Sequence, residues 1–231
     1  MSDTAPTLNS EVLAPATAPT PVLADLITEA AAGCKVRFRA GQTIIQQGDA
    51  STHVVLLRDG AAKVVLQTAS AEIVLGLRAA PEILGERAVL DGTPRSASVV
   101  ALTDVAALAV PAEDFLTLVT EHPKVATAVF AVIAERLCEA DRGRVDLATH
   151  TVTQRVAARL VALTPWIGVA EEETGAVRLP LTQQDLAGWV GASREAIVRT
   201  LRLLREAGVV TTERRQIVIR SLDALRTKMA G

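Results

Sequence analysis

A short stretch in the first half of the chain, GERAVLDGTPRSASV (Gly85–Val99), contains the residues best suited to binding a small molecule. Glu86 and Arg95 stand nine positions apart, and each lies beside a small residue. An arginine guanidinium can hold an anion such as a phosphate through paired hydrogen bonds, and a carboxylate accepts hydrogen bonds from hydroxyl groups. The stretch therefore predicts either a site for a small anionic ligand or an ion pair that closes a loop without one.

A second set of polar residues lies in LTQQDLAGWVGASREAIVRTLRLLREAGVV, the segment Leu181–Val210. Thr182 and Asp185 have the spacing of a capping box, Gly191 allows a turn, and Ser193 can cap the next helix. This order of signals predicts a helix-turn-helix motif.

The second helix of this motif has an apolar and a charged face, because residues follow one another at about 100° around a helix. The apolar face carries Ile197, Leu201 and Leu204, and the opposite face carries Glu195, Arg199 and Arg202. Arg194 and Glu195 occupy the first turn, where side chains of such motifs reach base edges in the DNA major groove. The alternative is that Glu195 and Arg199 form an exposed ion pair.

The last fifty residues are basic. Residues 182–231 hold nine Lys and Arg against five Asp and Glu, whereas residues 1–181 hold 15 against 21. Such an excess is typical of a nucleic-acid-binding surface, although a solvated face can produce it too. Val209, Val210, TTERR and QIVI predict a hairpin wing, in which Arg214 and Arg215 either meet phosphates or are ordinary turn residues.

Other chemistries find little support. An iron–sulfur site needs about four cysteines, and the chain has two, Cys34 and Cys138. The three histidines are scattered, and no phosphate-binding loop, nucleophile elbow or paired-cysteine metal motif occurs. We therefore expect neither a catalytic residue nor a metal site. The two widely separated cysteines indicate a reducing compartment, and therefore the cytoplasm. The longest uncharged apolar run, Val125–Ala134, is too short to cross a membrane.

The elements that must position these residues follow from composition and periodicity. Residues 1–21 hold four of the ten prolines and predict a disordered tail, and Val22–Ala32 predicts a short helix that Gly33 ends. The next segment, up to Val110, alternates short apolar runs with glycines and predicts a β-barrel or β-roll. Its expected strands are VRFRAG, HVVLLRDG, AAKVVLQT, EIVLGL, SASVVAL and VAALAV.

Helical periodicity returns at Ala112, and the segment from His122 to about Thr151 predicts one long helix. One stripe of it follows spacings of four and three, as in a helix that pairs with another helix. The stripe consists of Ala126, Phe130, Ile133, Leu137, Ala140, Arg144, Leu147 and Thr151. It indicates either a dimer contact or a helix that lies on its own domain.

With these residues in view, the chain resembles the cyclic AMP receptor protein / fumarate-nitrate regulator family of bacterial transcription factors, from about Val22 to Leu225. The most specific element is VGASREAIVRTLRLLREAGVV. The resemblance implies an α+β fold with a cyclic-nucleotide-binding-type β-roll (22–121), a long dimerisation helix (122–151) and a C-terminal winged helix-turn-helix (152–231). It also implies a homodimer that binds double-stranded DNA, acts with RNA polymerase and is controlled by a small effector.

The resemblance assigns roles to particular residues. Ser193, Arg194, Glu195, Arg199 and Arg202 take positions on the DNA-contacting helix, and Thr182, Gln183 and Gln184 take phosphate-contacting positions. GER-A followed by RSA is similar to the phosphate-binding cassette of cyclic-nucleotide-binding domains. Glu86 would bind a ribose hydroxyl and Arg95 the cyclic phosphate, with Gly85, Arg87, Ala88 and Ser96 around them.

One departure concerns the nucleotide base. Where cyclic AMP binders of the family carry Thr-Ser on the long helix, this chain has Ala140 and Asp141. An ionised Asp141 only accepts hydrogen bonds, so it can take the adenine amino group or the guanine edge, and the effector is expected to be cyclic AMP or cyclic GMP. The alternatives are that Asp141 pairs with Arg142 or Arg144, and that the chain is a sensing or protein-interaction module that needs no nucleotide or no longer binds DNA.

Overall fold

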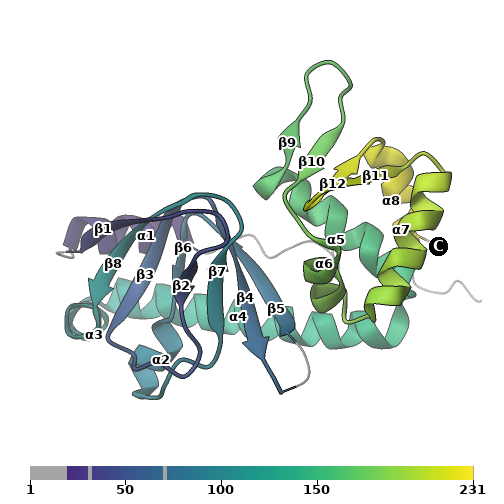
Figure 1. Ribbon diagram of the computed structural model, residues 1–231. Helices are drawn as coiled ribbons and strands as arrows, with labels where there is room; N and C mark the ends of the chain where they lie inside the picture. The colour runs from purple at the N-terminus through teal and green to yellow at the C-terminus, as the bar shows by residue number, and fades with distance from the viewer. Residues whose placement is uncertain (1–19, 31–32, 70–71, 231) are drawn as a thin grey trace, which may run out of the picture.

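Two four-stranded antiparallel sheets form the first half of the molecule (Figure 1). The computed structural model describes residues 20–30, 33–69 and 72–230. One sheet has the order β1-β8-β3-β6, with bounds Cys34–Phe38, Val105–Pro111, His53–Asp59 and Glu82–Leu84. The other has the order β2-β7-β4-β5, with bounds Thr43–Ile45, Ser98–Ala101, Ala61–Gln67 and Glu72–Ala79. The predicted β-roll is confirmed, and all six expected strands are present.

The central strand β3 explains how the roll is packed. Successive strand residues point to opposite faces, and both faces of β3 are buried. Val55 and Leu57 pack between the two sheets, whereas Val54 and Leu56 pack against helices on the outer face. A strand covered on both sides reads as a continuous apolar run, which is what VVLL is.

Three helices cover that outer face: α1 (Thr20–Ala30), α3 (Ala112–Glu121) and α4 (Pro123–Thr149). The helix expected at Val22–Ala32 begins two residues earlier, so the last two residues of the expected tail belong to it. Residues 1–19 of that tail, and residues 31–32, lie outside the described residues. A further short helix, α2 (Glu86–Asp91), follows β6 and was not expected from periodicity because it has only six residues.

The predicted stripe on the long helix α4 is partly exposed and partly packed against the roll. Phe130 and Leu137 are exposed, at 74% and 62% of their surface, as is Leu147. Ile133, by contrast, packs against the apolar cluster of the roll. The stripe also ends earlier than expected, because Thr151 caps the next helix, α5 (Val152–Ile167), through a capping box with Gln154. Ile133 thus packs on its own domain, as one interpretation of the stripe expects, whereas the dimer contact stays a prediction for the exposed residues.

The C-terminal part consists of helices and a small sheet. After α5 come α6 (Gln183–Val190), α7 (Arg194–Glu206) and α8 (Leu222–Ala230), of which α8 lies against α5. The sheet has the order β11-β12-β10-β9, with bounds Val210–Glu213, Gln216–Ile219, Val177–Leu179 and Val169–Ala170. The predicted helix-turn-helix is α6–α7 and the predicted wing is β11–β12, whereas β9, β10 and α8 were not expected.

Polar contacts join α4, α5 and α6 where the two halves meet. Arg159 of α5 pairs with Asp146 near the end of α4 at 3.3 Å, and its guanidinium lies 5.1 Å from the ring centroid of Trp189 on α6. Arg155 of α5 donates to the carbonyl oxygen of Val190 at 3.0 Å. These contacts fix the first helix of the helix-turn-helix relative to the long helix.

Candidate functional site

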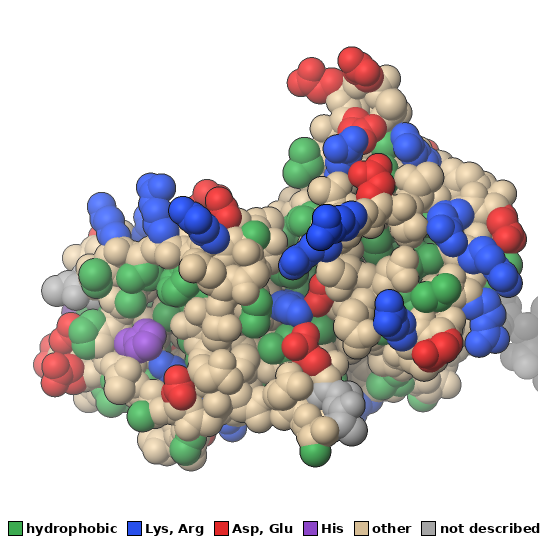
Figure 2. Space-filling model, in the orientation of Figure 1, with side chains coloured by type: hydrophobic (Ala, Val, Ile, Leu, Met, Phe, Trp, Pro, Cys, Tyr) green, Lys and Arg blue, Asp and Glu red, His purple; other side chains and the backbone are tan. Residues whose placement is uncertain are grey.

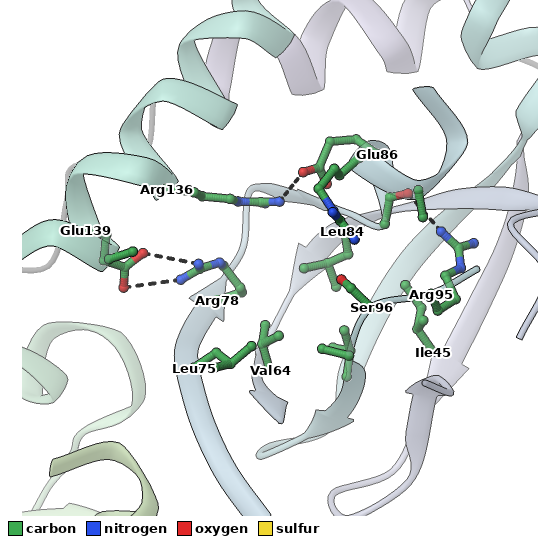
Figure 3. A pocket seen from close by; sticks show the side chains of 16 residues that line it. Ile45, Val64, Leu75, Arg78, Leu84, Glu86, Arg95, Ser96, Arg136 and Glu139 are labelled. Atoms are coloured by element: carbon green, nitrogen blue, oxygen red, sulfur yellow. Dashed lines mark hydrogen bonds and ion pairs between the residues drawn. The ribbon is translucent and has the colours of Figure 1, made fainter. Parts of the chain in front are cut away.

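A cavity of about 330 Å³ lies between the β-roll, α2 and α4 (Figure 3). Seven of the predicted ligand-binding residues line it: Gly85, Glu86, Arg87, Ala88, Arg95, Ser96 and Ala140. The remaining lining residues are Ile45, Val64, Leu75, Arg78, Leu84, Ala97, Val99, Arg136 and Glu139. The walls are thus mainly apolar, with charged groups at a few points.

Arg95 is a buried cation in this wall, with only 4% of its surface exposed. Its guanidinium donates to two carbonyl oxygens, that of Gly85 at 2.8 Å and that of His53. Among the described residues no carboxylate lies within ion-pair distance of it, so the alternative of a loop closed by a direct Glu86–Arg95 pair is not found, and Glu86 pairs with Arg136 instead. Burial lowers the pKa of Arg95, against the raising effect of Glu86 and Asp49.

Gly85 makes this position of Arg95 possible. Its φ of +80° belongs to the left-handed region, and a Cβ atom there would lie 2.3 Å from Nη1 of Arg95. Any other residue would displace the guanidinium. The glycine is therefore needed for a close approach, as expected, although the approaching group is the arginine itself.

Glu86 begins α2 and is almost fully buried, with 2% of its surface exposed. One carboxylate oxygen, Oε1, accepts from Nη1 of Arg136 on α4. The other, Oε2, is buried and has no hydrogen-bond partner among the described residues. A buried acceptor without a donor is costly, so this atom is suited to a donor that a ligand brings.

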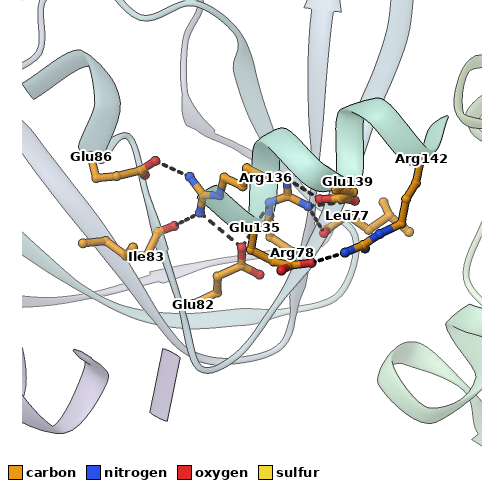
Figure 4. A network of polar contacts seen from close by, with 9 residues as sticks. All are labelled: Leu77, Arg78, Glu82, Ile83, Glu86, Glu135, Arg136, Glu139 and Arg142. Carbon is orange, nitrogen blue, oxygen red and sulfur yellow. Dashed lines mark hydrogen bonds and ion pairs between the residues drawn. The ribbon is translucent and has the colours of Figure 1, made fainter. Parts of the chain in front are cut away.

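Arg136 joins the cavity to a wider network of charges (Figure 4). Its Nη2 lies 3.1 Å from Glu82, which also pairs with Arg78 at 3.1 Å, and Arg78 pairs with Glu139 of α4 at 3.1 Å. Burial raises the pKa of Glu82, against the lowering effect of the two arginines. Burial lowers the pKa of Arg136, but Glu86 and Glu82 raise it by more.

Sequence reasoning missed Arg136, although a signal for it existed. Arg136 and Ala140 are four positions apart on a helix and therefore share a face. Once Ala140 is placed in the site, helical periodicity puts Arg136 there too. Arg78, Glu82 and Glu139 gave no such signal, because they meet only through tertiary packing.

Asp141 is the one predicted ligand residue that the structure does not bring to the cavity. It is exposed on α4 and pairs with Arg144 at 2.7 Å. The cause is helical geometry: Asp141 follows Ala140 by one residue and so points about 100° away from it. The alternative of a local ion pair describes Asp141 in this structure.

A wider hollow of about 610 Å³ lies at another end of the roll, beside Arg37, Arg39, Asp59 and Asp104. Its two carboxylates already have local partners. Asp104 accepts from the amide of Ala40 and Asp59 from that of Gly60, each at 2.9 Å. None of the predicted ligand residues lies there, so the smaller cavity is the better candidate.

The second candidate surface is the outer face of the helix-turn-helix. Ser193 caps α7 through the amide of Ala196, and Gly191 ends α6 in the left-handed region, as expected. The predicted apolar face is buried, and the predicted contact residues Arg194, Glu195, Arg199 and Arg202 are exposed. The ion pair on α7 is Arg202–Glu206, and the alternative Glu195–Arg199 pair is not found in the described part of the chain. Figure 2 shows Lys and Arg side chains gathered over this side of the molecule.

The start of α6 flanks this face. Thr182 caps the helix by a reciprocal capping box with Asp185. Gln184 is exposed, Thr182 and Gln183 are half-buried, and Arg214 and Arg215 at the wing turn are exposed. The predicted phosphate-contacting residues therefore lie beside the predicted base-contacting ones.

The described residues contain no group of three or more His, Cys, Asp and Glu side chains able to hold a metal ion. None of their helices is by itself long and apolar enough to span a membrane; α3 and α4 meet that test only together, across a bend of 110°.

Comparison with known proteins follows the same division into halves. Residues 35–122 match the cyclic nucleotide-binding domain, and residues 154–228 match the Crp-like helix-turn-helix domain. The chain is 26% identical over 193 residues to a CRP-like cAMP-activated global transcriptional regulator of Mycobacterium tuberculosis, covering 82% of this chain and 85% of that one.

Two other proteins are also similar. The cyclic AMP receptor protein of Thermus thermophilus is 37% identical over 123 residues, which is 53% of this chain and 54% of that one. The structure of CLP, a c-di-GMP responsive global regulator of Xanthomonas campestris, superposes with a TM-score of 0.73 at 20% identity. That superposition covers 87% of this chain and 99% of CLP, and it demonstrates a shared fold.

Proposed function

Because this chain belongs to the CRP/FNR family of transcription regulators, which are not enzymes, we propose that it is a cytoplasmic homodimer that binds double-stranded DNA under the control of a cyclic nucleotide. We propose RNA polymerase as a further partner, because transcription regulators act on it.

One observation carries the choice of ligand. Among the described residues, the cavity contains a buried cation with no carboxylate at ion-pair distance, Arg95, and a buried acceptor with no donor, Oε2 of Glu86. A molecule that complements both must bring an anion and a hydrogen-bond donor. The phosphodiester and the ribose hydroxyl of a cyclic nucleotide have this combination, and apolar Val64, Leu75 and Ala140 remain for the base.

Cavity size favours a mononucleotide. Sites for small molecules commonly span about 300–1,000 Å³, and this cavity of about 330 Å³ lies at the lower end. The relatives named for cyclic AMP agree with this choice, whereas CLP, named for c-di-GMP, has only the fold in common. Cyclic AMP and cyclic GMP are therefore the ligands to test.

The exposed apolar residues of α4 support the homodimer. Phe130 and Leu137 lie one heptad apart on the same face, and no described element of the chain covers them. If a second copy packed on this face, a two-fold axis would relate the α7 helices of the two copies. Such pairs enter successive major grooves when they lie roughly 34 Å apart.

The test is calorimetric titration of the wild-type chain and Arg95→Ala with cyclic AMP and with cyclic GMP. Losing a charged hydrogen-bonding partner costs about 1.5–3 kcal/mol, so the variant's affinity should fall roughly ten- to more than a hundredfold. Arg37→Ala, an exposed arginine on β1, is the matched control and should bind like the wild type. Equal affinity of Arg95→Ala and wild type would refute the assignment.

A further inference from the structure

Val198 is an exposed apolar residue inside the charged face of α7. It has 43% of its surface exposed. Arg194 lies four positions before it, Glu195 three positions before it and Arg202 four positions after it. Residues three and four positions apart are neighbours on a helix surface, so these charged side chains surround Val198. The valine therefore lies among the predicted base-contacting residues.

Neither the packing of the motif nor the stability of α7 explains a valine at this position. The buried side of α7 consists of Ile197, Leu201 and Leu204, each at most 2% exposed, and Val198 is not part of the cluster that they join. A β-branched side chain also has a lower helix propensity than Ala, Leu, Arg or Lys. The methyl groups of Val198 thus face the solvent, at a surface that bound DNA would cover.

The DNA major groove offers one group that a valine can recognise. Most features of the base edges there are hydrogen-bond donors or acceptors, which a valine cannot pair with, whereas the C5-methyl group of thymine is apolar. The N-terminal residues of the second helix of such a motif reach base edges. Val198 is the fifth residue of α7 and directly precedes Arg199, a predicted base contact. It therefore reaches the groove together with its charged neighbours.

The charged neighbours and the valine are suited to different tasks. Arg194 and Arg199 form no ion pair with any described residue, and Arg202 lies 3.8 Å from Glu206. Arginine pairs with phosphates and with guanine, so these cations can hold α7 at the groove. An apolar side chain between them distinguishes a methyl group from a hydrogen atom or an amino group.

We propose that Val198 contacts the 5-methyl group of a thymine in each half of the DNA site and thereby determines part of the sequence specificity. The assignment rests on the proposed DNA binding, to which it adds the chemical group that is recognised. A cytosine at that position would place a polar base edge, without the methyl group, against the valine.

The test replaces thymine by deoxyuridine, which removes only the methyl group. A DNA site is first selected from random sequence with the wild-type chain, in the presence of cyclic AMP or cyclic GMP. Each thymine of one half-site is then replaced in turn, and affinity is measured by competition. At one of these thymines the wild-type affinity should fall about fourfold, as expected for one buried methyl group.

Val198→Ala and Leu203→Ala are the matched variants. Alanine favours helix formation, so Val198→Ala keeps α7 intact. At the same thymine its loss on deoxyuridine substitution should shrink below twofold, while its losses at the other thymines match those of the wild type. Leu203 is also exposed, at 51%, but points about 140° away from Val198 around the helix. Leu203→Ala should therefore keep the whole wild-type pattern.

Two results overturn the assignment while leaving DNA binding intact. One is a pattern of losses that Val198→Ala leaves unchanged, and the other is a selected half-site in which no thymine methyl group affects affinity. If the wild-type chain selects no DNA sequence with either nucleotide present, the proposed function fails, and the assignment of Val198 fails with it.

Discussion

Two arginines that line the ligand cavity, buried Arg95 and half-buried Arg136, differ in their partners. Arg136 is neutralised by Glu82 and Glu86, whereas Arg95 is held by carbonyl oxygens alone. Carbonyl dipoles orient a guanidinium but do not cancel its charge. Arg95 therefore keeps its attraction for an anion, and Arg136 keeps α4 close to Glu86.

Asp185 offers a test at a single carboxylate. Burial raises its pKa, but hydrogen bonds from Lys63 and Thr182 lower the pKa by more, so the net pKa is below the usual value. We expect Asp185→Asn to lower the free energy of unfolding at pH 7 by about 1–3 kcal/mol, through loss of a charged hydrogen bond and a cap.

The sign of the pH dependence follows from that direction. A carboxyl whose pKa is lower in the folded state stabilises the fold above the usual aspartate pKa of about 3.9 and loses this effect as the pH falls through the folded pKa. Urea unfolding between pH 7 and pH 3 should therefore show the gap between wild type and variant closing at the acid end. Asp223→Asn, on the exposed start of α8, is the control, and a gap that stays constant would contradict the prediction.

How well single residues could be predicted depended on local sequence. Glu86 and Arg95 were identifiable because small residues flank each of them, and both line the cavity. The paired network of Arg78, Glu82 and Glu139 could not be, because its members come from three elements that meet only in the folded chain. Asp141 was misplaced by one step of a helix, which is enough to turn a side chain away.

Among the elements, α7 carries the most specific expectation. Arg199 is exposed on the face opposite the buried side of α7, where it can contact a base edge. Arg199→Ala should cost about 1–3 kcal/mol on the preferred DNA sequence and much less on random DNA.

Competition gel shifts at two salt concentrations check this, using a DNA site obtained by selection from random sequence. Arg226→Ala on α8 serves as the control. Equal losses on selected and random DNA would show that Arg199 contacts only phosphate. No binding to either DNA, with no dependence on salt, would favour the alternative that this motif no longer binds DNA.

Secondary-structure prediction succeeded for elements that are long enough to show a hydrophobic period. The seven-residue strands β3, β4 and β8 and the helix-turn-helix were all expected. The three-residue strands β2 and β6 and the two-residue strand β9 were missed because alternation cannot be seen over so few residues. The end of α4 was missed because Thr151 continues the helical spacing while its side chain caps α5.

For the whole molecule, the exposed apolar face of α4 predicts a homodimer. Leu137→Glu places a charge in a contact that would otherwise bury a leucine from each copy. Burying a leucine is worth about 1.5–3 kcal/mol, so the dimer dissociation constant should rise roughly a hundredfold or more. Sedimentation at micromolar concentration should show the monomer, and DNA affinity should fall with it.

Val169→Glu, an exposed apolar position on β9, is the control for this change. An unchanged mass for Leu137→Glu would place the dimer contact elsewhere. The ion pair between Lys63 of β4 and Asp185 of α6 belongs to this scale too, and sequence gave no hint of it, because the two residues are 122 positions apart.

The stacking of Arg159 on Trp189 has an experimental consequence. The chain has two tryptophans and no tyrosine, and both tryptophans, Trp166 on α5 and Trp189 on α6, lie in the C-terminal part. Tryptophan fluorescence therefore arises from the DNA-binding half alone, and the β-roll contributes none. A change in emission on adding an effector would report a rearrangement at the junction without any attached dye.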